Sequence, residues 1–592
     1  MIAPPAAEPL PAQPLPAAGP ADDEEVFVFP ATAAQQRFWL LDQLVPGGNP
    51  ALNMAVSLRL RGSLDLPALE RACNALAERH EALRTTFQYE GGGLCQIIAP
   101  ALALRVVVVD VRDFPEPERA GVPVHLAAEE AARPFDLAHG PLCRVLLVRV
   151  SPVEHALFFT LHHIVSDGWS NGVLGRELVA LYEACAHGKP SPLAPPGLQF
   201  ADFAQWQQDR TVAGGFDADL AYWREKLSGE LPVLDLPADH PRGASARTRV
   251  AAAGTRWRRL PDALAATLRT LAAHEGASAY MLYLAAFTAL LSRYDAAGSE
   301  DLIVGTPSAN RHRAEVEGVV GLFVNPLLLR ADLSGNPSFR ELLARTRQTL
   351  LGAFTHAEAP FERLIEELQT RRFQVNFLYA SAFLQPARTS DLEWLPQDPV
   401  SGGATYEWDA TVVEDASGVR LSIEYNADLF DAATVDRALA DYESFLAAVA
   451  APGGLETPIR QLPLASVPAR AAATLLVRRE RLPQASAGWV ERFFETDGRG
   501  RAGVGLRVVN RHGEDTPAGV AGEIVIHAPD QPEAGYRTGD LGARRSDGPV
   551  EWLGRLREQV SAGGQRVDTR AVERALGAHP HVREALVRPL PG

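Results

Sequence analysis

The chain has 592 residues, of which 46% are apolar and 22% are charged, and this composition is typical of folded globular domains rather than of disordered chains. Its 57 basic and 73 acidic residues give a formal net charge of −16. An acidic chain lacks the basic surface that binds a phosphate backbone, so nucleic acid is not an expected partner. The longest apolar stretch, residues 279–291, is too short to span a bilayer, and no membrane association is expected.

The first 25 residues are rich in Pro and Ala and lack both the basic region and the apolar core of a secretory signal. Residues 1–25 therefore predict an extended, flexible tether. The cysteines form no CxxC pair, which indicates reduced thiols in the cytoplasm and argues against a disulfide scaffold or a zinc ribbon. They are Cys73, Cys95, Cys143 and Cys185.

From residue 26 onward, the spacing of apolar residues predicts alternating helices and strands. A helix that begins with a Thr cap is expected over 32–44, and two adjacent antiparallel strands over 143–150 and 155–162. The other elements expected in the first half are strands at 55–61 and 105–111 and helices at 66–84, 173–187 and 200–209.

A Pro-rich crossing segment at 228–245 separates this half from a second set of similar elements. They are one helix over 264–291, strands at 301–306 and 322–329, and a helix over 338–354. The simplest account is two α/β lobes of about 200 residues each. Beyond residue 451 the composition predicts a linker, followed by a smaller unit of about 100 residues.

The densest group of reactive residues is HHIVSDG, residues 162–168. Adjacent strand residues point to opposite faces, so one imidazole of the pair at the strand end can face a given cavity. Histidine with a near-neutral pKa is the usual group that takes a proton from an attacking nucleophile. Asp167 can orient a ring or pair with a cation, and Gly168 leaves room for a backbone or a substrate. The alternative is that both rings are structural.

Three other motifs are weaker. A zinc site would need a third ligand at metal spacing, and only His155 is near. Residues 168–172 match the GxSxG motif of serine hydrolases, but the expected strand ends several residues before Ser170. Residues 498–503 have GxGxxG spacing but follow no clean strand, so they predict a loop.

HHIVSDGWS resembles the HHxxxDG motif of condensation domains in nonribosomal peptide synthetases, and its neighbours match that family's other motifs in order. The matching segments are TAAQQRFWLLDQL, RHEALRTTF, FADFAQW, EGVVGLFVNPLLLR and THAEAPFERLIEEL. The resemblance covers about residues 26–450. It implies an α/β fold of two chloramphenicol-acetyltransferase-like lobes in a V-shaped pseudo-dimer. The active site would lie in a tunnel between the lobes, reached by carrier-bound donor and acceptor from opposite faces.

The resemblance also implies roles for single residues. His163 would be the catalytic histidine and Asp167 a structural carboxylate, with His162 and Gly168 supporting the site. Arg311, in GTPSANRHR, would be the salt-bridge partner of Asp167, because a partly buried carboxylate needs its cation. The intact HHxxxDG argues against a heterocyclisation domain, and the continuation DGWSNGVLGRELVALY looks more like an ordinary condensation domain than an epimerisation domain. The seventh motif, which lines the acceptor side in relatives, is shortened here to QTRRFQVNF, residues 369–377.

The last hundred residues are similar to the end of an adenylation domain. The matching segments are AGVAGEIVI, YRTGDL, GRLREQVSAGGQRVD and AVERALGAHPHVREALV. In that family the Asp of TGD holds the ribose hydroxyls of ATP, which implies Asp540, with Arg555 nearby. The phosphate loop with its Lys, the aromatic-Gly-x-Thr-Glu segment and the terminal catalytic Lys are missing, and Arg557 takes the hinge position, which is usually Asp. Without phosphate-binding donors, we expect a truncated remnant that does not adenylate.

The sequence therefore predicts a condensation enzyme that joins a carrier-bound acyl or aminoacyl thioester to an amine or hydroxyl acceptor, giving an amide or an ester. No cofactor or metal of its own is expected, because substrates would arrive on the phosphopantetheine of carrier proteins in trans, or as a free small-molecule acceptor. Two alternatives are a coenzyme-A-dependent acyltransferase of the same fold and a non-catalytic module that docks a carrier or a tailoring enzyme. The expected units are a tether at 1–25, lobes at 26–205 and 206–452, a linker at 453–484 and a truncated adenylation-like domain at 485–592, in a cytoplasmic protein.

Overall fold

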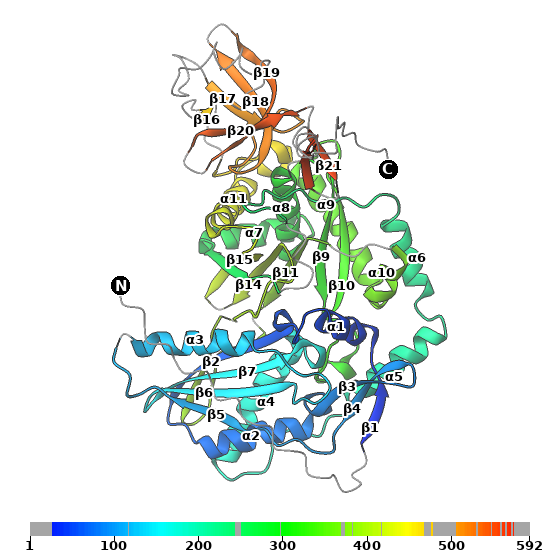
Figure 1. The fold of residues 1–592 in the computed structure, drawn as a ribbon, viewed down its shortest axis with the longest axis vertical. Coiled ribbons are helices and arrows are strands. Elements are labelled where there is room, and N and C mark those ends of the chain that lie inside the picture. The colour runs from blue at the N-terminus through cyan, green and yellow to red at the C-terminus, as the bar shows by residue number, and fades with distance from the viewer. Residues whose placement is uncertain are drawn as a thin grey trace, which may run out of the picture.

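The computed structural model shows two lobes stacked along the long axis of the molecule, with a third unit beyond the second lobe (Figure 1). The expectation of two α/β lobes is therefore confirmed. The structure describes residues 26–116, 118–242, 250–295, 298–368, 373–381, 383–398, 400–415, 417–466, 475–476, 505–528, 531–545, 548–556, 559–562, 565–569 and 572. The expected tether at 1–25, the loop at 498–503, residues 369–372 of the shortened motif and Arg557 lie outside these residues.

The first lobe is built on a six-stranded sheet in the order β12-β13-β2-β7-β6-β5. The predicted neighbours β6 and β7 pair antiparallel, which confirms that expectation. The middle of each strand is apolar because both faces of the sheet are covered: Leu147 lies in the main core of the lobe, and the adjacent Val148 in a smaller core with α3. The strands are β2 (Asn53–Gly62), β5 (Val106–Asp110), β6 (Cys143–Ser151), β7 (Glu154–His162), β12 (Ala387–Arg388) and β13 (Leu392–Pro396).

The helices of this lobe include α1, which begins with a capping box between Thr32 and Gln35, as a Thr cap predicts. A small sheet in the order β1-β4-β3 lies beside it. The helices are α1 (Ala33–Gln43), α2 (Leu66–Arg79), α3 (Glu118–Ala132), α4 (Gly168–Ala186) and α5 (Phe200–Val212). The small sheet contains β1 (Phe27–Pro30), β3 (Thr85–Glu90) and β4 (Gly93–Ile98).

The second lobe repeats the architecture, with a six-stranded sheet in the order β10-β9-β11-β14-β15-β8. In β14 the buried residues Trp408, Ala410 and Val412 belong to the core of this lobe, and the residues between them are less buried. The strands are β8 (Ala253–Arg259), β9 (Asp301–Ser308), β10 (Asn325–Asp332), β11 (Val375–Ser381), β14 (Trp408–Asp415) and β15 (Gly418–Asn426). The helices are α6 (Asp217–Lys226), α7 (Asp262–His274), α8 (Ala279–Tyr294), α9 (Phe339–Thr355), α10 (Phe361–Leu368) and α11 (Ala432–Ala450).

The single helix expected over 264–291 is wrong, because the structure has two helices, α7 and α8, in its place. Gly276 has a φ of 63°, in the left-handed region that ends a helix, and Ser278 then caps the start of α8. Apolar spacing continues across this break, so periodicity alone does not show it. No helix within the described ranges is long and apolar enough to cross a membrane.

Two later segments of the chain return to the first lobe. Strands β12 and β13 extend its sheet next to β2, with Trp394 opposite Leu60. Val319, Leu322 and Phe323 pack in its core, although they lie between β9 and β10 of the second lobe. Both segments connect the second lobe to the first. Helix α1 lies between the two lobes in Figure 1.

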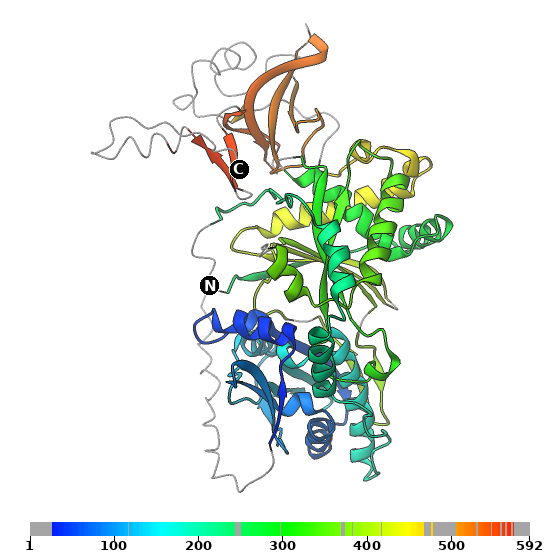
Figure 2. The ribbon, with the colours of Figure 1, turned by 90° about the vertical axis from the view of Figure 1, so that its right-hand side faces the viewer.

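The third unit is a five-stranded sheet in the order β16-β20-β19-β18-β17, with a separate hairpin of β21 and β22. It contacts the second lobe through Arg293 on α8, which donates a hydrogen bond to the carbonyl oxygen of Asp515. The same guanidinium donates to the carbonyl oxygens of Arg460 and Leu462, in the segment that precedes this unit. Figure 2 shows it at the end of the second lobe that faces away from the first. The strands are β16 (Leu475–Leu476), β17 (Gly505–Val509), β18 (Ala521–Ala528), β19 (Gln531–Arg544), β20 (Val550–Arg555), β21 (Gln559–Ala562) and β22 (Gln565–Asp568).

Residues 453–466, inside the segment whose composition predicts a linker, lie against the second lobe. Leu455, Ile459, Leu462 and Leu464 are buried in its core. The backbone N–H of Ser466 donates a 2.6 Å hydrogen bond to the carboxylate of Asp441 on α11.

Candidate active site

The histidine pair lies where β7 ends. His162 is the last residue of the strand, and His163–Val165 form a single turn of 3-10 helix. Asp167 then caps α4, because its Oδ1 accepts a 2.7 Å hydrogen bond from the backbone N–H of Ser170. Ser170 is a buried helical residue whose hydroxyl donates to the carbonyl oxygen of Gly321, so the strand-turn-helix geometry of a serine nucleophile does not occur here.

The His163 ring is held in one tautomer by the backbone. Its Nδ1 lies 2.8 Å from the carbonyl oxygen of Ser166, and a carbonyl only accepts, so Nδ1 carries the proton. Nε2 is then left with the lone pair that can take a proton. Burial lowers the pKa of His163 below its ordinary value of 6.5, which keeps the ring neutral at pH 7. The ring of Phe38 on α1 lies against it, with centroids 4.8 Å apart.

The His162 ring is enclosed, with none of its surface exposed to solvent. Its Nδ1 accepts a 3.1 Å hydrogen bond from the backbone N–H of Ile164, and its Nε2 lies 3.7 Å from Oδ1 of Asp42. Burial also lowers the pKa of His162. These contacts fit a ring that fixes the strand end and the turn after it.

Asp167 and Arg311 form a buried ion pair, with Arg311 Nη2 3.3 Å from Asp167 Oδ1. The other carboxylate oxygen accepts a 3.0 Å hydrogen bond from the backbone N–H of Phe323. Arg311 also donates to Ser170 Oγ and to the carbonyl oxygens of Val316 and Val319. The pair therefore fixes the 311–323 segment against the start of α4.

The side chain of Phe383 lies close to Gly168. A Cβ atom at Gly168 would lie 2.9 Å from the Phe383 ring. One turn and two turns further along α4, a Cβ atom at Gly172 would lie 2.8 Å from the carbonyl oxygen of Phe383, and one at Gly175 would clash with the side chain of Leu384. The glycines of α4 thus seat the segment that follows β11.

Asp540 and Arg555 lie in the third unit, on the neighbouring strands β19 and β20, and the structure does not bring them together with the histidines (Figure 1). The Asp540 carboxylate is fully buried, and Arg555 Nη1 lies 2.9 Å from its Oδ1. The Asp540 carboxylate is thus already bonded to a group of the protein itself.

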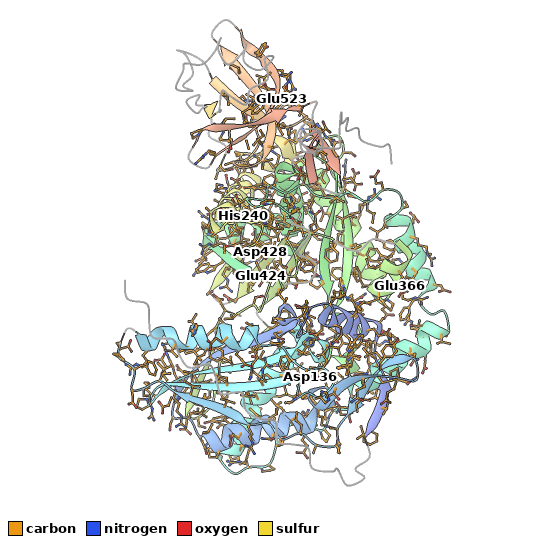
Figure 3. The ribbon with its side chains drawn as sticks, in the orientation of Figure 1. Asp136, His240, Glu366, Glu424, Asp428 and Glu523 are labelled. Carbon is orange, nitrogen blue, oxygen red and sulfur yellow. The ribbon has the colours of Figure 1, made fainter. Side chains whose placement is uncertain are left out.

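Sequence reasoning assigned no role to two groups near this site. The first is Arg37 on α1, which forms an ion pair with Glu362 on α10, although both lie in segments that match family motifs. The second is a pair of carboxyl groups, Asp409 and Glu424, directly opposite each other on β14 and β15. Burial raises the pKa of Asp409 to about 6 and that of Glu424 to about 7. Figure 3 shows Glu424 on the side of the second lobe nearest the first.

The signal for the carboxyl pair is present in the sequence. In WDATVVED, residues 408–415, apolar residues alternate with others, and this pattern places Asp409 on the face opposite the core. The partner of Arg37 could not be read in this way, because Glu362 lies on a helix of the other lobe.

Comparisons with known proteins identify the family. Residues 27–469 match the family model for the condensation domain. The linear gramicidin synthase of Brevibacillus parabrevis has a subunit that is 41% identical over 446 residues, which are 74% of this chain and 6% of that protein. The chain spans only 6–11% of the length of the first four curated relatives.

Solved structures agree. The X-domain from teicoplanin biosynthesis is 31% identical, with a TM-score of 0.64 over 74% of this chain and 97% of that chain, and it has also been solved in complex with OxyB. The first condensation domain of the calcium-dependent antibiotic synthetase, in complex with a substrate analogue, has a TM-score of 0.64 over 74% of this chain and 99% of that chain. Its identity of 21% supports the fold alone. The chain belongs to the condensation-domain family of nonribosomal peptide synthetases.

Proposed function

We propose that this chain joins a carrier-bound acyl or aminoacyl thioester to an amine, giving an amide, with His163 as the proton acceptor. The observation that carries this proposal is the state of the His163 ring. Nδ1 donates to Ser166 and leaves Nε2 unprotonated, and burial keeps the ring neutral. A histidine that acts as a general base must be unprotonated at working pH and present its lone pair in a fixed direction.

In the proposed reaction, the acceptor amine attacks the thioester carbonyl carbon, and a carbon–nitrogen bond forms. The amine proton passes to Nε2 of His163, the carbon–sulfur bond breaks, and the proton then goes to the departing thiolate. The products are an amide and a free carrier thiol. A hydroxyl acceptor would follow the same steps and give an ester. Asp167 and Arg311 would act by holding the turn after His163, since both are buried and bonded to α4 and to residues 316–323.

The chain would need no cofactor of its own, because both substrates would arrive on phosphopantetheine arms of carrier proteins in trans, or the acceptor would be a free small molecule. We propose that the reaction takes place in the cytoplasm, where such carriers are loaded. We also propose that the chain divides into a tether at 1–25, lobes at 26–205 and 206–452, a linker at 453–484 and a third unit at 485–592. The third unit is proposed to be an adenylation remnant without ATP chemistry, which is supported by the closed Asp540–Arg555 pair.

Turnover with defined carriers tests the proposal. Purified chain is mixed with an acyl-loaded donor carrier and either an aminoacyl-loaded acceptor carrier or a free amine, and the product is measured by intact-protein mass spectrometry. A chain with His163→Ala serves as the control for uncatalysed aminolysis. Product formation above that control supports the proposal, whereas equal rates for both chains contradict it. An added arm with ATP and amino acids measures pyrophosphate exchange, which the remnant proposal expects to be absent.

A second candidate is a non-catalytic docking module, and the likeness to the X-domain solved with OxyB favours it. Such a module would bind loaded carriers or another enzyme without turning them over. A third arm with acyl-coenzyme A as donor addresses the remaining alternative of a coenzyme-A-dependent acyltransferase. Binding of carriers without product in any arm would support the docking module.

A further inference from the structure

An ion pair joins the two lobes next to His163. Arg37 lies on α1 of the first lobe and Glu362 on α10 of the second, and the guanidinium Nε is 3.0 Å from the carboxylate Oε1. The two side chains are 25% and 12% exposed, which makes this pair much less solvated than a surface pair. Helices α1 and α10 lie side by side at the level where the lobes meet (Figure 1).

The guanidinium of Arg37 also lies near two aromatic rings. Its central carbon is 5.1 Å from the ring centroid of Phe38 and 5.0 Å from that of Phe361, which precedes Glu362 on the second lobe. Both distances are within the range of a cation–π contact. Phe38 is in turn the ring that packs on His163, with centroids 4.8 Å apart. Contacts therefore run without a break from α10, through Arg37 and Phe38, to the histidine.

The Glu362 carboxylate depends strongly on this arginine. Within the described part of the chain, its two buried oxygens accept no hydrogen bond of good geometry, so the charge of Arg37 is what compensates them. Leaving one member of a partly buried pair without the other is unfavourable, because the remaining charge is poorly solvated. Separation of α10 from α1 would incur that cost and would also remove Phe361 from the guanidinium.

We propose that the Arg37–Glu362 pair is an inter-lobe clasp, in which Arg37 is a positioning residue that holds Phe38 on the His163 ring when the two lobes are together. This inference rests on the proposed role of His163 as the proton acceptor. According to this proposal, the guanidinium of Arg37 couples the movement of the lobes to the position of the His163 ring. The clasp makes the site competent when both lobes are in place, and opening it loosens the ring that receives the proton.

The test compares Glu362→Gln with a matched control, Glu358→Gln. Glu358 forms a 2.8 Å ion pair with Arg210 on α5, with exposed fractions of 30% and 27%, and Arg210 also lies near two aromatic rings, those of Trp206 and Phe216. None of these contacts involves Phe38 or His163. The control thus loses the same kind of charge pair without the path to the histidine.

We expect Glu362→Gln to lower kcat by about tenfold or more and to change KM for the acceptor much less, because small displacements of a catalytic group reduce the rate more than the binding. Glu358→Gln should leave both values near those of the unchanged chain. The reversed pair, Arg37→Glu with Glu362→Arg, should recover part of the loss if the ion pair itself matters. Equal, small effects in Glu362→Gln and Glu358→Gln would overturn the clasp.

A readout without turnover separates the clasp from the proposed function. In chain labelled with ¹³C at histidine Cε1, the Phe38 ring current shifts the His163 signal, which is identified by its loss in His163→Ala. Glu362→Gln and Phe38→Leu should both move this signal toward the position of a free histidine, and Glu358→Gln should not. If the chain turns out to be inactive with all carriers, this shift still supports the clasp. An unchanged His163 signal in folded Glu362→Gln overturns the clasp even if the enzyme is active.

Discussion

Replacement of Asp167 by Asn perturbs the most enclosed ion pair of the site. The side chains of Asp167 and Arg311 are 2% and 1% exposed, and the carboxylate has three donors around it: the backbone N–H groups of Ser170 and Phe323, and Arg311 Nη2. An Asn side chain keeps one acceptor oxygen but turns its NH₂ group toward a donor. It also leaves the Arg311 charge without a counter-ion.

Loss of one partner of a buried pair costs about 3–5 kcal/mol. We expect the lower end, about 3 kcal/mol, because Arg311 keeps three neutral acceptors, namely Ser170 Oγ and the carbonyl oxygens of Val316 and Val319. For a lobe of about 200 residues this corresponds to a fall in Tm of roughly 6–12 °C.

The assay is thermal unfolding followed by circular dichroism, with Glu393→Gln as the control. Glu393 pairs with Arg388 on the surface, with exposed fractions of 42% and 79%, so its loss should cost less than about 1 kcal/mol. The double change Asp167→Asn with Arg311→Met should recover part of the loss. A shift in Asp167→Asn as small as that of the control, or strictly additive effects of the two changes, would refute the reasoning.

Three further predictions concern pH and the third unit. Because the pKa of His163 is lowered by burial and the neutral ring is the base, the acid limb of the kcat/KM profile should have its midpoint below pH 6.5; a midpoint above that value would contradict the assignment. Because the pKa values of Asp409 and Glu424 are raised, the folded chain binds their protons more tightly than the unfolded chain does. The contribution of the two carboxyl groups to stability is therefore complete below about pH 4 and is lost as pH rises through about 6 and 7. Tm should fall as pH rises over that range, and Asp409→Asn should make the fall smaller. A chain that ends after residue 466 should fold and melt well above one that ends after residue 452. The shorter chain loses four buried side chains from the core of the second lobe, at about 1.5–3 kcal/mol each, namely those of Leu455, Ile459, Leu462 and Leu464. Equal melting of the two chains would show that this segment does not support the lobe.

The sequence was a good guide wherever the determining interactions are local. The capping box at Thr32, the paired strands β6 and β7 and the end of β7 at His162 all follow from residues within a few positions of one another. The motif at 162–168 likewise has its turn and helix cap within seven residues. Apolar spacing was less informative at α7 and α8, since the pattern continues through Gly276 while the backbone does not.

Interactions between distant segments could not be predicted from the residues alone. The tautomer of His163 depends on the backbone carbonyl of Ser166, which no residue type specifies. The ion pair of Arg37 with Glu362 depends on how the lobes meet. The packing of Phe383 against Gly168 depends on the path of the segment after β11. Such contacts are set by tertiary packing, which local patterns do not encode.

The rate of amide formation in the chain with His163→Ala tests the central claim most directly. The measurement uses a loaded donor carrier and a saturating amine acceptor, with folding checked by Tm and with His162→Ala beside it. If Nε2 of His163 takes the proton, turnover should fall by about 10²-fold or more while Tm stays near that of the unchanged chain. For His162, which is enclosed, the main effect should be on Tm. Full turnover in a folded His163→Ala chain would contradict the account.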